Sequence, residues 1–382
     1  MKYKLEDLFD LQMGKTPARN NPEYWNSADN KWISIGDLSK CGKYITNTKE
    51  YLSDTAVEES GISLIPENTV VMSFKLSIGK TAITREPMYS NEAIMSFRDK
   101  HVVPILPDYL YYMFLAKDWD EGTNKAVMGK TLNKATLAKV TIDVHSPTEQ
   151  KKIVDTLDKV ASAIDARQQQ LSALDDLIKA RFVEMFGDPK ANPFHLKKVA
   201  LKDTCVVVTG NTPSRAVPEY YGELIEWVKT DNIVSGRLNP TTATEYLSEA
   251  GMRAGRTVDA GAILMACIAG SIASIGKVCV TDRKVAFNQQ INAVIPKNYN
   301  VLFLYVMLQI SKDYLVEEIN MALKGILSKS KLEEKEFILP PLEKQEKFAT
   351  FVTQIDKSKS VIQKYLDETQ LLFDSLMQKY FG

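Results

Sequence analysis

The chain repeats itself, and this repeat constrains its fold more than any other feature of the sequence. Eight blocks of the first half recur in the same order in the second half, at an offset of 195 to 197 residues. That period is too long for a solenoid, whose units run to about 20–50 residues. Each half is therefore expected to fold as a domain-sized unit. Two blocks return unchanged, namely 50–53 (Glu-Tyr-Leu-Ser) as 245–248 and 77–80 (Ser-Ile-Gly-Lys) as 274–277.

Each half begins with a part of mixed character. Short apolar runs such as 69–72 and 262–265 lie between turn-forming residues, which is typical of strands joined by turns. Helical stretches follow them later in each half. The pattern predicts an α/β (mixed) fold for residues 1–146 and, in the copy, for residues 188–340.

Each half ends in one long helix, predicted for residues 147–187 and 341–382. Apolar residues recur there at steps of three and four, which is a heptad seam. A helix of about 38 residues would be roughly 57 Å long. Two such helices can bury their stripes against each other, and we expect this pairing, although each helix could instead pack on its own domain. Arg167, Lys359 and Thr369 interrupt the seams, whose apolar residues are Ile153, Leu157, Val160, Ile164, Leu171, Leu174 and Ile178, and Phe348, Val352, Ile355, Ile362, Leu366, Phe373 and Leu376.

Composition narrows the class of protein. No run of about 18 apolar residues is present, so no membrane span is expected. The four cysteines form no Cys-x-x-Cys pair and the three histidines lie far apart, so no metal site is predicted, and reduced thiols in the cytoplasm are expected. Basic and acidic residues both number 48. A role in binding DNA therefore requires positive charge gathered on one face or supplied by a partner.

The doubled order of motifs resembles the specificity subunit of Type I restriction-modification systems over the whole chain. One departure is Ser146-Pro147, where that family tends to have two prolines. The likeness is carried by Gly14-x-Thr16-Pro17, Tyr24-Trp25 and Trp32 with their copies Gly210-x-Thr212-Pro213, Tyr220-Tyr221 and Trp227, by 77–80 and its copy, by the helix entries 146–150 and 340–345, and by Phe-Gly at 186–187 and 381–382.

The resemblance implies that each mixed part is a target recognition domain that reads one half of a split DNA target. The long helices would pack as an antiparallel coiled coil and hold the two domains a fixed distance apart. Two methyltransferase (modification) subunits would bind this chain, and restriction/translocase subunits can join them. S-adenosylmethionine, ATP and Mg²⁺ would belong to those partners, while this chain would hold no cofactor and catalyse no reaction.

Three loops in each half carry the side chains that DNA reading needs. Lys and Arg hold phosphates, while Arg, Asn, Ser, Thr and Lys reach base edges. The candidates are Lys15, Thr16, Arg19 and Asn20 with Asn211, Thr212, Ser214 and Arg215 in the copy; Lys75, Ser77, Lys80 and Thr81 with Ser271, Ser274 and Lys277; and Lys130, Asn133 and Lys134 with Lys324, Ser328 and Lys329.

A purely structural role remains open for each loop. Thr-Pro could end a strand, the Ser-Ile-Gly-Lys block could be a plain turn, and the Lys-rich loop could simply be solvated. Trp25, Trp32 and Trp227 are expected to fill cores rather than stack on bases. The loops also differ between the halves, for instance in Arg19 aligned with Val217, so an asymmetric target is expected.

Enzyme motifs are incomplete in this sequence. Gly79-Lys80-Thr81 ends like a phosphate-binding loop, but Phe74 occupies the place of its first glycine. Asn192-Pro193-Phe194 lacks the second proline of an amino-methyltransferase motif. The alternative to a DNA-reading subunit is a non-enzymatic adaptor whose duplicated domains hold two protein partners.

Overall fold

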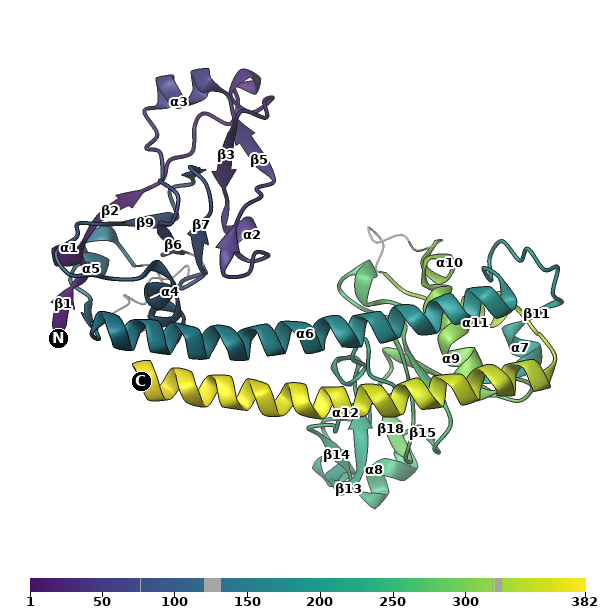
Figure 1. The fold of residues 1–382 in the computed structure, drawn as a ribbon. Coiled ribbons are helices and arrows are strands. Elements are labelled where there is room, and N and C mark those ends of the chain that lie inside the picture. The colour runs from purple at the N-terminus through teal and green to yellow at the C-terminus, as the bar shows by residue number, and fades with distance from the viewer. Residues whose placement is uncertain (76, 120–131, 318, 320–324) are drawn as a thin grey trace. The chain divides into compact units, whose positions relative to one another are not determined.

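The computed structural model describes residues 1–75, 77–119, 132–317, 319 and 325–382. The chain divides into two compact units, the first made of Met1–Asp165 with Asp367–Gly382 and the second of Ala166–Leu366 (Figure 1). None of the described helices is both long and apolar enough to pass through a lipid bilayer.

The first unit is built on a five-stranded sheet in the order β2-β9-β6-β7-β4. All four residues of β6 are buried, as expected for a strand covered on both faces. Smaller sheets are ordered β5-β3-β8 and β1-β10. The strands are β1 Lys2–Lys4, β2 Phe9–Met13, β3 Asn30–Ile33, β4 Tyr44–Ile45, β5 Glu50–Leu52, β6 Val70–Ser73, β7 Thr81–Thr84, β8 Tyr89–Ser90, β9 Ile94–Asp99 and β10 Thr141–Asp143.

Helix α4 covers this sheet. It packs against β6 and β7, and its residue Phe114 lies with its ring centroid 4.7 Å from that of Phe97 on β9. Because Tyr109, Leu110 and Phe114 are all buried, α4 joins the sheet to the core of the unit. The helices before α6 are α1 Leu5–Leu8, η1 Pro22–Tyr24, α2 Ile35–Leu38, α3 Asp54–Ser60, α4 Pro107–Ala116 and α5 Lys134–Ala138.

The second unit repeats this plan. Its main sheet has the order β12-β19-β16-β17, which matches β2-β9-β6-β7, and β14-β13-β18-β15 and β11-β20 complete it. The strands are β11 Lys198–Ala200, β12 Cys205–Thr209, β13 Tyr221–Val228, β14 Tyr246–Leu247, β15 Thr257–Val258, β16 Ile263–Ala266, β17 Val278–Val280, β18 Val285–Phe287, β19 Ile291–Pro296 and β20 Glu336–Ile338. The remaining elements are α7 Leu201–Thr204, η2 Pro218–Tyr220, η3 Thr230–Asn232, α8 Glu249–Ala254, η4 Ile272–Ser274, α9 Val301–Ile310, α10 Lys312–Val316 and α11 Lys329–Glu334. The predicted mixed, duplicated fold is confirmed.

Two helices of 40 residues, α6 (Pro147–Phe186) and α12 (Leu342–Phe381), run through both units. In the second unit Phe182 contacts Phe348, Asp175 bonds Lys359, and the Arg167 guanidinium faces the ring of Tyr365. Positions rise along α6 as their partners fall along α12, so the helices are antiparallel there.

The predicted seams are the inward faces of these helices. All fourteen seam residues are buried or half-buried. The seams also pack on their own domains, because Leu157 joins the α4 cluster and Ile178 joins the α9 cluster. Both packing arrangements that the periodicity allowed therefore occur together. Phe182, Phe186 and Met377 are also buried, although the predicted seams leave them out.

Lys359, one of the polar residues that interrupt the seam, is largely shielded from solvent and makes specific bonds. The Lys359 side chain is 12% exposed and donates to the Asp175 carboxylate and to the Gly236 carbonyl. The polar position on α12 thus binds both α6 and the second mixed domain.

In the first unit, Lys43 of the mixed domain likewise forms ion pairs that connect the domain to α6. Its side chain is 14% exposed, and its ammonium lies 2.6 Å from carboxylate oxygens of Asp108 on α4 and Asp158 on α6. Tyr44 and Tyr112 donate to the same two carboxylates. Burial would raise the pKa of Asp108, but its hydrogen bonds from Lys43 and Tyr44 hold that pKa below the usual value.

Replacing Lys43 with methionine is expected to destabilise the first unit by about 1–3 kcal/mol at pH 7, because two partly buried carboxylates lose their counter-ion. The depressed pKa of Asp108 means that this stabilisation is present above the pKa of the unfolded chain and is lost as pH falls through the folded value. Urea unfolding at pH 7 and near pH 3 tests this, with the exposed Lys40→Met as the control. Equal costs for the two variants at pH 7 would contradict it.

Candidate nucleic-acid interface

The first predicted loop starts at Gly14, where the backbone leaves no room for a side chain. After β2, the Gly14 amide donates to the Ile94 carbonyl at 3.1 Å and the Lys15 amide to the Ser90 carbonyl at 2.8 Å. A side chain at Gly14 would overlap the carbonyl oxygens of Ser90 and Asn91. Gly210 opens the copy in the same way, against the carbonyls of Phe287 and Asn288. Glycine here allows one backbone to lie directly on another.

An arginine closes the same loop. The Arg19 guanidinium pairs with Glu50 and lies 3.8 Å from the Trp25 ring centroid, while Trp32 donates its indole N–H to the Lys15 carbonyl at 3.0 Å. Trp32 is buried and Trp25 half-buried, and they pack edge to face, as expected of core tryptophans. Arg19 is thus held by its own domain, and a DNA contact from it stays a prediction.

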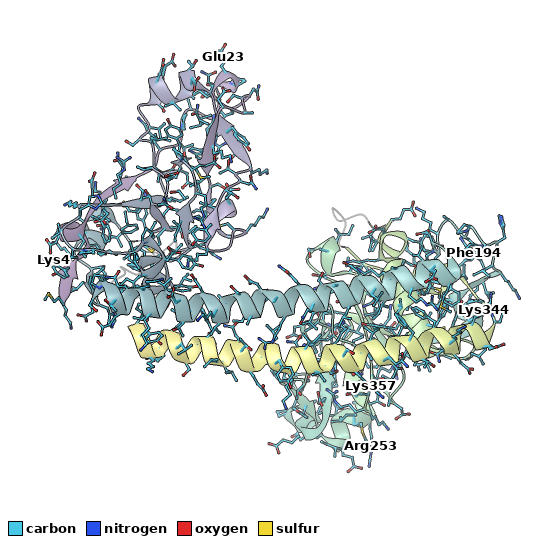
Figure 2. All side chains as sticks on the ribbon, in the orientation of Figure 1. Lys4, Glu23, Phe194, Arg253, Lys344 and Lys357 are labelled. Atoms are coloured by element: carbon cyan, nitrogen blue, oxygen red, sulfur yellow. The ribbon has the colours of Figure 1, made fainter. Side chains whose placement is uncertain are left out.

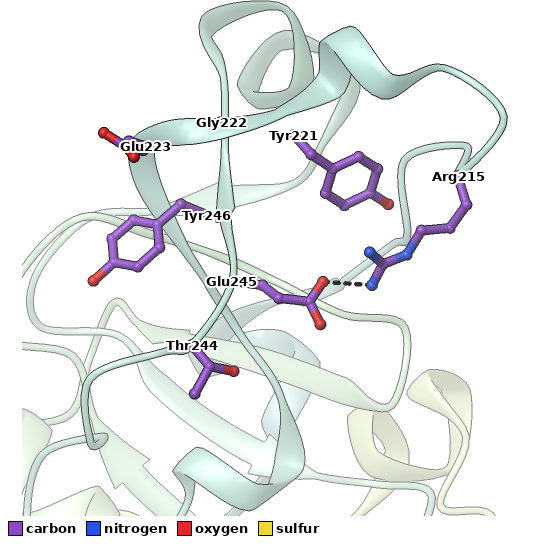
Figure 3. A pocket seen from close by; sticks show the side chains of 7 residues that line it. All are labelled: Arg215, Tyr221, Gly222, Glu223, Thr244, Glu245 and Tyr246. Atoms are coloured by element: carbon purple, nitrogen blue, oxygen red, sulfur yellow. Dashed lines mark hydrogen bonds and ion pairs between the residues drawn. The ribbon is translucent and has the colours of Figure 1, made fainter.

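The second unit repeats this arrangement beside an open cavity of about 640 Å³ (Figure 3). Arg215 pairs with Glu245 and lies 4.4 Å from the Tyr221 ring centroid. Trp227, which is buried, donates to the Asn211 carbonyl at 3.3 Å. Lys229 and Arg215 bond Glu245 and hold its pKa below the usual value. Arg215 is therefore the counterpart of Arg19, and the alignment of Arg19 with Val217 is wrong.

Other residues of the first loop have local partners. Lys15 donates to the Ser60 carbonyl, and Asn211 donates to the Ala254 carbonyl at 2.9 Å. Ser214 accepts from the amide of Ala216. Asn20 is exposed and makes no side-chain hydrogen bond within the described part of the chain. The loop is thus tied to its own domain, with Asn20 free at its tip.

The second predicted loop is the turn between β6 and β7. Gly79 has φ +86°, its amide donates to the Ser73 carbonyl, and Ser77 offers its carbonyl to the Ser73 hydroxyl. Thr81 closes the turn with a 3.0 Å bond to the Gly79 carbonyl. Lys80 is exposed and carries no ion pair among the described residues.

The corresponding turn between β16 and β17 is longer. Phe74 and Cys267 are equivalent, since each donates its amide to the residue before β9 or β19. The Ser-Ile-Gly-Lys block follows four residues later relative to Cys267 than relative to Phe74. Ser271 donates to Ser274, and Lys277 is half-buried after Gly276. The two halves therefore present turns of different length at the same place.

The residues of the third predicted loop have different roles in the structure. Asn133 caps α5 by accepting from the Thr136 amide at 2.8 Å, and Ser328 caps α11 by accepting from the Lys331 amide at 3.3 Å. Lys134 is exposed, while Lys329 lies 3.6 Å from Glu333. Two further candidates, Lys130 and Lys324, lie outside the described residues. The amides of Leu132 and Leu327 bond the carbonyls of Phe74 and Cys267, which ties this segment to the second loop.

Sequence reasoning missed Glu92 and its counterpart Gln289, which bond the first loop of each domain. Thr16 donates its hydroxyl to the Glu92 carboxylate, and in the copy Thr212 donates to Gln289. The bond from Thr16, with the nearby charges of Lys75 and Arg19, holds the pKa of Glu92 below its usual value. The repeated Asn91 and Asn288 directly precede these residues and were the available signal.

Three of the four cysteines are buried in the second unit. Burial raises the pKa of Cys205 to about 11 and those of Cys267 and Cys279 to about 12, so these thiols stay protonated. Within the described ranges, no three His, Cys, Asp or Glu side chains are grouped to hold a metal ion. The loops can instead offer hydrogen bonds and charge to a large polar ligand.

Known proteins resemble this chain over its full length. A family model described as "Type I restriction modification DNA specificity domain" matches residues 1–175 and again 194–369. The Type I restriction enzyme MjaIX specificity subunit of Methanocaldococcus jannaschii is 24% identical, over 98% of this chain and 91% of that protein.

Solved structures share the fold at lower identity. The Type I restriction-modification S subunit from M. genitalium superimposes with a TM-score of 0.59 at 13% identity, covering all of this chain and 96% of that one. A chain from a study of complex assembly and conformational transition in the type I R-M system gives a TM-score of 0.55 at 16% identity, covering 100% and 97%. The likeness includes both mixed domains and the long helices.

Proposed function

Because the chain belongs to the Type I restriction modification DNA specificity family, we propose that each half reads one half-site of an asymmetric, bipartite DNA target. The chain is the DNA specificity subunit of such a system, with two target recognition domains, and is its non-catalytic subunit. The finer assignment rests on one observation. Both halves build the same loop on Gly14 or Gly210 but fill it differently, with Lys15 in the first and Asn211 in the second.

The loops are suited to base reading because their shape is set before DNA arrives. Arg19 and Arg215 are exposed but held by ion pairs to Glu50 and Glu245, so fewer side chains must be ordered on binding. The turn between β6 and β7 also differs from its copy, which is longer. Loops of different length and chemistry favour two different half-sites, and hence an asymmetric target.

The long helices support two further roles. A continuous helix of 40 residues is about 60 Å long, which would fix the gap between half-sites. In the second unit, α12 exposes Val361 and Tyr365 beside charged residues such as Lys357 (Figure 2). Neighbouring exposed apolar side chains on a helix are typical of a protein-binding surface. We assign α6 and α12 to the docking of two methyltransferase subunits in the cytoplasm, which would bring S-adenosylmethionine, while restriction/translocase subunits would bring ATP and Mg²⁺.

Duplex binding by the chain assembled with its methyltransferase subunits tests this proposal. Affinity for the sequence that the complex methylates should exceed its affinity for unrelated DNA by about a thousandfold or more. It should also fall steeply as salt rises, because phosphate contacts release counterions. Changing the gap by one base pair should abolish the preference. Binding that ignores sequence, gap and salt would favour the adaptor function instead.

A further inference from the structure

Glu92 and Gln289 occupy the same place in the two recognition domains. Each follows an asparagine whose side chain accepts from the amide two residues on, at 3.0 Å in the first domain and 3.1 Å in the second. The asparagine amides donate to the carbonyls of Ile33 and Val228, at the ends of β3 and β13. The backbone of this turn is therefore held alike in both domains.

The side chains of Glu92 and Gln289 differ in the terminal atom that is not bonded to the threonine. Thr16 donates to one carboxylate oxygen of Glu92, which leaves the other oxygen as an acceptor. Thr212 donates to the amide oxygen of Gln289, which leaves its NH₂ group as a donor. Both side chains are exposed, and no other side-chain bond occupies these free atoms among the described residues. One domain thus presents an acceptor where the other presents a donor.

Base edges in the major groove are distinguished by this same difference. Adenine and cytosine expose an amino group there, whereas guanine and thymine expose an acceptor oxygen at the corresponding ring position; both purines also expose the N7 acceptor, so the contact that discriminates is the one to that ring position. A carboxylate is repelled by phosphates, so an ionised Glu92 on a DNA-facing loop suits base edges better than the backbone. Lys75 and Arg19 lie close enough to Glu92 to offset its charge.

We propose that Glu92 and Gln289 are specificity-determining residues, with Glu92 selecting a base that carries an amino group and Gln289 selecting a base that carries an acceptor. This inference rests on the proposed function, because it assumes that each domain reads a half-site. It goes further by assigning one position in each half-site to one named residue.

The Glu92→Gln variant separates base reading from loop structure. Glutamine keeps an oxygen to accept from Thr16, so the loop stays anchored while the free acceptor becomes a donor. The assembled complex would select duplexes from a library randomised in both half-sites. We expect Glu92→Gln to shift preference at one position of one half-site from adenine or cytosine towards guanine or thymine, by about 10- to 100-fold. Gln289→Glu should make the reverse change in the other half-site.

The control is Glu58→Gln, which makes the same change of charge at an exposed residue of α3 and should leave the selected sequence unchanged. An unchanged selection by Glu92→Gln, an equal loss of affinity for all sequences, or no selection at all would each overturn the inference. If the unmodified complex selects no bipartite sequence, the proposed function itself fails. The two failures are therefore distinguishable.

Discussion

Replacing Phe348 with alanine should destabilise the second unit by about 3–5 kcal/mol, the range for removing a fully buried phenylalanine. Phe348 is 0% exposed, and its ring centroid lies 5.4 Å from that of Phe182 and 5.7 Å from that of Phe186, both on α6. Phe303 on α9 completes the cluster at 6.3 Å. The rings join both long helices to the domain, so the cavity would open where three elements meet.

Hydrogen exchange of the α9 amides measures this loss within the second unit. Protection should fall by roughly two to four orders of magnitude, since about 1.4 kcal/mol corresponds to a tenfold change. The exposed Gln354→Ala on α12, the helix that carries Phe348, should leave the protection of the α9 amides unchanged. Wild-type protection in Phe348→Ala would mean that the ring cluster does not hold the helices to the domain.

Replacing Gly14 with alanine should lower the affinity of the assembled complex for its target by on the order of 100-fold or more. The new methyl group would overlap the carbonyl oxygens of Ser90 and Asn91, so the loop would have to leave its seat. The first domain would then lose contacts to more than one base pair, each worth about 1–3 kcal/mol. The loss should fall on sequence-specific binding, because the phosphate contacts that we propose elsewhere in the complex would remain.

Gly42→Ala is the matched control, since nothing lies within 4 Å of a side chain added at that glycine in the same unit. Binding assays on target and non-target duplexes compare the two variants. Equal affinities of Gly14→Ala and Gly42→Ala for the target would contradict a role of the first loop in recognition.

The long helices and the duplication could be predicted because their signals are local or periodic. A heptad seam depends only on spacing along one helix, and all its predicted members face inward. Phe182 and Phe186 were missed because their burial depends on Phe303, more than a hundred residues away. The packing of each seam on its own domain could not be separated from helix pairing by periodicity.

The local partners of the candidate DNA-binding residues could not be predicted from the sequence, for a physical reason. Side-chain type makes Arg19 and Arg215 candidates for DNA binding, but their acidic partners Glu50 and Glu245 lie about thirty residues further along the chain. The unchanged return of the Glu-Tyr-Leu-Ser block was the available signal for those partners. The capping roles of Asn133 and Ser328 follow from ordinary N-cap preferences.

Ion pairs within each domain neutralise part of the positive charge near the loops. Several basic residues near the loops, including Arg19, Arg215 and Lys229, are paired with carboxylates of their own domain. Other cations of the candidate loops, such as Lys75, Lys80 and Lys277, have no ion pair among the described residues and could contact phosphates. The positive charge available to DNA is therefore local to the loops and does not depend on the net charge of the chain.

The central claim is that two domains of one chain read two different half-sites across a fixed gap. Sequencing the methylated bases of cells with and without the gene tests it most directly. We predict methylation at a single bipartite, non-palindromic motif with one gap length, and its disappearance when the gene is removed. A palindromic or continuous motif, or methylation that persists without the gene, would contradict the account.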